Sequence, residues 1–104
     1  MQEVKIVQLA DVVNVQPEAV VSREILSKPT GTVTLFAFDA GEGLSEHTTP
    51  FDAMVYALEG EVDFTISGTH YTLHAGEMLI MPADEPHALQ AITAFKMLLV
   101  MIRS

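Results

Sequence analysis

Four histidines are the side chains in this sequence best suited to acid–base chemistry or metal binding. They are His47, His70, His74 and His87. An imidazole can ligate a divalent metal, exchange a proton near neutral pH, or accept and donate hydrogen bonds. The chain has no cysteine, which excludes thiolate catalysis and cysteine-based metal sites.

Asp52 and Glu46 are carboxylates that lie close to His47 in the sequence. Either could act as a general acid or base if burial removed it from water, and the alternative is an ordinary exposed loop carboxylate. Asp52 has the stronger case because Phe51 and Ala53 flank it. The sequence has neither a Gly-x-Ser-x-Gly elbow nor a phosphate-binding glycine loop. No residue is therefore assigned a catalytic role.

The residues around these side chains predict many short strands. Val, Ile and Thr are frequent, and Gly or Pro interrupts the apolar runs at regular intervals. Gly60 and Gly68 are placed at tight hairpin turns, and Asp11 is the expected cap of a short helix over 12–15. The strands are predicted at residues 5–8, 19–26, 32–39, 44–48, 53–59, 61–67, 70–74, 78–81, 87–91 and 95–102. This spacing is typical of an all-β sandwich or barrel, here a single domain over 1–104.

Two spacing motifs narrow this prediction. In the first, five residues separate Gly41 from His47, and the sequence Val-Tyr-Ala-Leu-Glu-Gly-Glu occupies 55–61. In the second, Gly76, Pro82 and His87 follow one another with intervals of five and four residues. Together the motifs resemble the cupin superfamily over roughly half of the chain. The resemblance implies a double-stranded β-helix, or jelly-roll barrel, which is commonly a homodimer.

In cupins, two histidines and a glutamate of the first motif join the histidine of the second motif around a metal ion. This sequence keeps His47 and His87, but Thr49 and Ala53 stand at the other two positions. The resemblance therefore implies a degenerate metal site, with Asp52 as a possible third ligand. Two imidazoles hold Zn, Mn, Fe or Ni weakly, so no cofactor is certain.

Strand alternation places the candidate pocket on the inward face of the barrel. The predicted lining residues are His47, Thr49, Ala53, Val55, His87 and Leu89. Met54, Tyr56 and Leu58 should point to the opposite face, which then needs a cover from the N-terminal segment or a second subunit. His70 and His74 are expected at the solvent-facing surface.

Two functions remain open at this stage, beside the weaker option of a purely dimeric accessory protein. The first is a small-molecule-binding protein that holds its ligand in the barrel cavity without a tightly bound metal. The alternative is a metal-dependent enzyme of the isomerase, decarboxylase or dioxygenase type that acts on a small metabolite. Whether the protein is an enzyme is left open.

Charge and composition restrict the partners. Five Lys and Arg face fourteen Asp and Glu, which gives a net charge of −9. Nucleic acid and anionic membrane are poor partners for such a chain, because both need clustered cations. The expected partners are a small-molecule ligand and a second copy of the chain, and the expected location is the cytoplasm.

Overall fold

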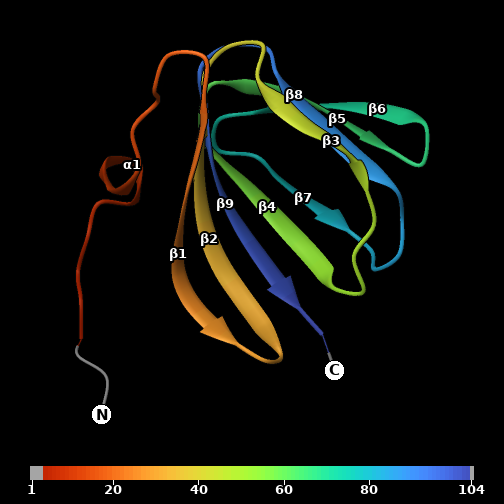
Figure 1. Cartoon of the computed structure of the whole chain (residues 1–104), viewed down its shortest axis with the longest axis horizontal. Coiled ribbons are helices and arrows are strands. Elements are labelled where there is room, and N and C mark those ends of the chain that lie inside the picture. The colour runs from red at the N-terminus through yellow and green to blue at the C-terminus, as the bar shows by residue number, and fades with distance from the viewer. Residues whose placement is uncertain (1–3, 104) are drawn as a thin grey trace.

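The computed structural model describes residues 4–103, and these form one helical turn and nine strands (Figure 1). The elements are α1 (Leu9–Val12), β1 (Val20–Lys28), β2 (Gly31–Phe38), β3 (Gly43–His47), β4 (Asp52–Glu59), β5 (Glu61–Ile66), β6 (Thr69–His74), β7 (Met78–Met81), β8 (His87–Ala91) and β9 (Phe95–Ile102). Nine of the ten predicted strands are present, with bounds that differ by at most two residues. None of the helical segments described is long and apolar enough to cross a membrane.

The strands form two antiparallel sheets. Sheet A has the order β1-β2-β9-β4-β7, and sheet B has the order β3-β8-β5-β6. The all-β prediction is therefore confirmed, and the order is consistent with a jelly roll. Among the described residues the backbone ladders belong to two separate sheets rather than to one closed barrel.

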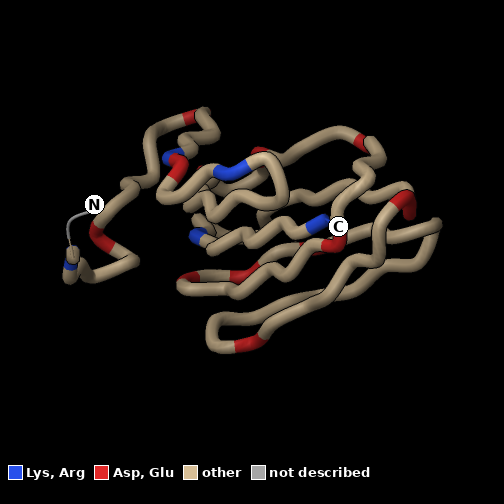
Figure 2. Tube along the Cα trace, turned by 90° about the horizontal axis from the view of Figure 1, so that it is seen from below, with Lys and Arg blue, Asp and Glu red and all other residues tan. Residues whose placement is uncertain are grey.

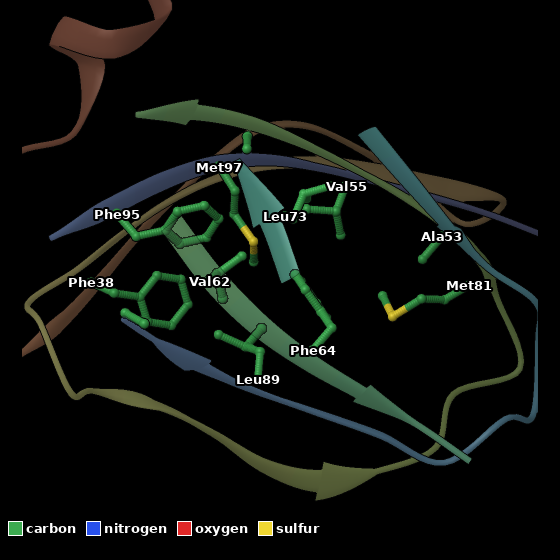
Figure 3. Close-up of a cluster of buried hydrophobic side chains, with 12 residues drawn as sticks. Phe38, Ala53, Val55, Val62, Phe64, Leu73, Met81, Leu89, Phe95 and Met97 are labelled. Carbon is green, nitrogen blue, oxygen red and sulfur yellow. The ribbon is translucent and has the colours of Figure 1, made fainter. Parts of the chain in front are cut away.

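The core lies between the two sheets (Figure 3). Alternate side chains of each strand point into it, as a pleated strand requires. Phe38 and Phe95 occupy one end with ring centroids 5.9 Å apart, whereas Ala53 and Met81 occupy the other end. Ala53, the smallest of the labelled side chains, thus lies at the end away from these two phenylalanines. Burial of these apolar groups is the main favourable term in folding.

A second apolar cluster lies on the outer face of sheet A. Val13 of the N-terminal segment is buried there against Leu35 and Ala37 of β2, and Leu58 of β4 packs on the same cluster. The ammonium of Lys96, which is also buried, donates to the carbonyl of Ala10 at 2.5 Å. The predicted cover over this face is thus the N-terminal segment, although it covers only part of sheet A (Figure 1).

Two predictions for the N-terminal region are wrong. Residues 5–8 form no strand, and Ile6 is 96% exposed because no described strand pairs with this stretch. The helical turn begins at Leu9 rather than after Asp11, and its N-cap, Gln8, makes no side-chain cap hydrogen bond. The turn is positioned by packing and by the Lys96 hydrogen bond, which local capping signals do not report.

The two predicted hairpin glycines are confirmed. Gly60 joins β4 to β5 with φ of 83°, and Gly68 joins β5 to β6 with φ of 84°. Left-handed backbone of this kind favours glycine. The two sites differ in their surroundings, since a Cβ at Gly60 would lie 2.0 Å from the carbonyl oxygen of Ala94, whereas nothing lies within 4 Å at Gly68.

This difference predicts unequal costs for the same substitution. Gly68→Ala should lower the free energy of unfolding by about 1 kcal/mol, which is the backbone strain alone. Gly60→Ala adds the steric overlap with Ala94 and should cost roughly 3 kcal/mol. Urea unfolding followed by circular dichroism measures both. Equal losses of unfolding free energy in the two variants would show that the close approach of Ala94 to Gly60 does not affect stability.

Candidate functional site

A cavity of about 200 Å³ opens between the sheets at the end of the core with the smaller side chains. The structure places all six predicted pocket residues on its wall: His47, Thr49, Ala53, Val55, His87 and Leu89. Seven further residues, which sequence reasoning did not assign to the pocket, complete the lining: Phe36, Leu44, Phe64, Met81, Met97, Leu99 and Met101. The wall is therefore apolar except for two imidazoles and one hydroxyl.

The imidazoles come together because β3 pairs with β8. His47 lies opposite His87 in the ladder, and their ring centroids are 4.2 Å apart. A register shift separates this pair from the pair Leu44 and Leu89, so that β3 has one more residue than β8 between them. The bulge lets Leu44 and His47 both reach the cavity although they are three positions apart. Strict alternation could not have predicted Leu44.

The two rings are held in the same way. Nδ1 of His47 lies 2.7 Å from the carbonyl oxygen of Ser45, and Nδ1 of His87 lies 3.1 Å from that of Glu85. A carbonyl oxygen only accepts hydrogen bonds, so each Nδ1 carries a proton. In the neutral ring Nε2 then keeps its lone pair. Neither Nε2 has a hydrogen bond to any residue in 4–103.

The two histidines differ in their exposure to solvent. His87 is only 8% exposed, whereas His47 lies at the exposed rim. Thr49, also near the rim, directs its hydroxyl to the backbone of Phe51, whose N–H lies 3.3 Å from Thr49 Oγ1. The cavity thus offers one buried imidazole and one accessible imidazole.

The carboxylates considered from the sequence do not join the histidines. Oδ1 of Asp52 accepts a hydrogen bond from the backbone N–H of Ala83 at 2.9 Å, and Asp52 does not line the cavity. Glu46 is exposed on β3 and does not line it either. Within residues 4–103, no three side chains of His, Cys, Asp or Glu gather in a metal-binding group. The donor set at His47 and His87 therefore does not fit the four-ligand shell of the family.

The other two histidines lie away from the cavity. His70 and His74 are exposed on β6, as predicted, with His70 Nδ1 2.8 Å from a carboxylate oxygen of Asp63. The backbone N–H of His74 donates to Glu77 and lowers the pKa of that carboxyl below its ordinary value. These are exposed contacts between imidazoles and carboxylates, which contribute little to stability.

Comparison with known proteins assigns the family. The model of the cupin domain matches residues 34–103, so the chain belongs to the cupin family. Conserved protein SPY1581 of unknown function from Streptococcus pyogenes is 34% identical with a TM-score of 0.93, covering 100% of this chain and 91% of that one. A cupin superfamily protein from Desulfitobacterium hafniense is 25% identical with a TM-score of 0.92 and coverages of 100% and 95%.

A cupin 2 conserved barrel domain protein from Leptotrichia buccalis is 36% identical, with a TM-score of 0.88, over 90% of this chain and 46% of that one. No curated protein matches the chain. The relatives support the family and the fold, and their names indicate no ligand or reaction.

The missing ligand positions predict a gain of metal binding on substitution. Thr49→His combined with Ala53→Glu should create a four-ligand set with His47 and His87, and zinc affinity should rise by at least 100-fold over the parent. Isothermal titration with ZnCl₂ measures it. Thr49→His with Ala53→Gln is the matched control, because it keeps the shape and removes the carboxylate. A parent that already binds one metal per chain at nanomolar affinity would contradict this prediction.

Proposed function

We propose that this cupin binds a small, largely apolar molecule in the cavity between its sheets and does so without a tightly bound metal. The observation that carries the proposal is the cavity of about 200 Å³ with an apolar wall and two oriented imidazoles. Ligand sites of this kind combine apolar contact area with a few fixed polar groups that orient the ligand.

The side chains of the cavity wall can adapt to ligands of different shapes. Met81, Met97 and Met101 line the cavity beside Phe36 and Phe64. Methionine side chains are flexible and polarisable, so they adapt to aromatic or aliphatic ligands. The volume limits the ligand to about the size of a single substituted ring.

A metal-dependent enzyme is the second candidate, and one observation favours it. The Nδ1 hydrogen bonds from His47 and His87 to backbone carbonyls are of the type that orients metal-ligating histidines. The zinc titration of the parent chain separates this candidate from the metal-free proposal.

Methionine methyl groups give a direct test of cavity binding. With 13C-methyl methionine labelling, titration with phenol or toluene should shift the resonances of Met81, Met97 and Met101, which line the cavity. Met54 and Met78, which lie on sheet A but do not line it, are internal controls and should not move. Shifts spread equally over all five methyls would contradict the proposal.

Filling the cavity provides a matched pair of variants. Ala53→Leu places extra volume on the cavity wall and should weaken probe binding by at least 10-fold. Ala88→Leu makes the same change on β8 at a residue that does not line the cavity, and should leave probe affinity unchanged. Equal affinities in both variants would place the ligand elsewhere.

We also propose that a second copy of the chain covers the part of sheet A that the N-terminal segment leaves open. Tyr56, Met78, Ile80 and Ile102 are exposed on β4, β7 and β9, and we call these four residues the outer apolar patch. Met78 pairs with Tyr56 in the ladder, so these two exposed side chains are neighbours across β4 and β7. Exposed apolar groups gathered in this way are typical of interaction sites.

The distribution of charge favours association of two chains through sheet A over association through sheet B. The stretch 29–95 has no Lys or Arg, and the strands of sheet B have acidic residues but no basic ones. Sheet A instead carries three basic residues, Arg23, Lys28 and Lys96, and three acidic ones, Glu24, Asp52 and Glu59 (Lys and Arg are blue and Asp and Glu red in Figure 2). Two chains of net charge −9 therefore repel least when they approach through sheet A.

A charge placed in the outer apolar patch should prevent this association. Ile80 is 61% exposed, and Ile80→Glu should raise the dimer dissociation constant by at least 10-fold. Ile92, which is 50% exposed in the turn before β9, offers the control Ile92→Glu. Light scattering at tens of micromolar measures the mass of each. A parent chain that is monomeric under these conditions would overturn the dimer.

A further inference from the structure

We infer that the ligand presents an uncharged hydrogen-bond donor, a hydroxyl on a small apolar ring or chain, to Nε2 of His87. This inference rests on the proposed binding function and adds the chemical class of the ligand. Phenol is the simplest compound of that class. The argument depends on which atoms the cavity offers and which charges it lacks.

The two imidazoles of the cavity offer acceptors rather than donors. Each Nδ1 donates to a backbone carbonyl, at 2.7 Å for His47 and at 3.1 Å for His87. In neutral imidazoles this fixes the proton on Nδ1 and leaves a lone pair on Nε2. Nδ1 is bonded to Cγ and therefore lies on the side of the ring nearer the backbone. Nε2 lies on the far side of the ring. A ligand therefore has to supply the proton of the hydrogen bond.

The need for a donor is strongest at His87. This side chain is 8% exposed and lies among apolar groups such as Leu89 and Phe64. A ligand that fills the cavity displaces water from Nε2 of His87, and a ligand hydroxyl replaces the hydrogen bond that this water would make. His47, at the rim and 4.2 Å away between ring centroids, is close enough to accept from a second hydroxyl or from water.

With both imidazoles neutral, the cavity does not provide a counter-charge for an ionic ligand. No Lys, Arg, Asp or Glu lines it. Two of the five basic side chains have other partners: Lys96 donates to Ala10, and the guanidinium of Arg103 lies over the Phe51 ring, 5.3 Å from its centroid. Burial of an unpaired carboxylate or ammonium in apolar surroundings is costly. The ligand class is therefore neutral, which excludes carboxylates and protonated amines.

Three probes of similar size separate this inference from the proposed function. Phenol has a hydroxyl where toluene has a methyl group, and benzoate has an anionic carboxylate. At pH 8, followed by the methionine methyl shifts, phenol should bind about 10-fold more tightly than toluene, as one hydrogen bond predicts. Benzoate should bind more weakly than phenol.

Any other order of affinities for the three probes would contradict either the inference or the proposed function. Equal binding of toluene and phenol, or tightest binding by benzoate, would overturn the inference and leave the binding function standing. Binding of none of the three would overturn the binding function as well. His87→Leu should remove the preference for phenol over toluene while toluene still binds. His70→Leu, on the exposed surface of β6, should keep the preference.

A second measurement needs no substitution. Long-range 1H–15N spectra of the parent chain at pH 8 report the tautomer of each imidazole. His47 and His87 should show a protonated Nδ1 and an unprotonated Nε2, and phenol should shift the Nε2 resonance of His87. A protonated Nε2 on His87 in the neutral ring would overturn the inference whatever the variant does.

Discussion

The packing of two sheets with side chains of unequal size is the constraint on which the rest of this structure depends. Phe38 and Phe95 fill one end of the core, whereas Ala53 and Met81 lie at the other end (Figure 3). Interiors are close-packed, so a deficit of volume at one end has to appear as a cavity, as water or as a ligand. The candidate site is thus a consequence of how the core is filled, and its apolar wall continues the core.

Backbone geometry decides what chemistry the cavity offers. The bulge in β3 brings His47 to the same wall as Leu44 and opposite His87. The carbonyls of Ser45 and Glu85 then hold both rings in one orientation. Two imidazoles held in this way can accept hydrogen bonds from a ligand, but with Asp52 committed to Ala83 they are not joined by a third metal ligand. The chain keeps the cupin fold while Thr49 and Ala53 occupy two of the four ligand positions, so its function has to be argued from the site and not from the fold.

The outer faces of sheet A and sheet B differ in exposed apolar side chains and in charge. Sheet A combines exposed apolar side chains with Arg23, Lys28 and Lys96, and sheet B is acidic and holds the surface ion pair of His70 and Asp63. The N-terminal segment covers one part of sheet A through Val13 and Lys96. The proposed association through the remaining part of sheet A would leave the acidic strands of sheet B in water.

The sequence by itself determined the strand pattern, the hairpins at Gly60 and Gly68, and the family, because period-two alternation, left-handed glycines and motif spacing are local signals. It also indicated the inward-facing pocket residues on β4 and β8. The tertiary structure decided the rest. Leu44 and the cavity methionines could not be assigned, since a bulge and packing between distant strands place them. The partner of Asp52 and the position of the N-terminal turn likewise depend on contacts with Ala83 and Lys96, which lie far away in the chain and have no local signature.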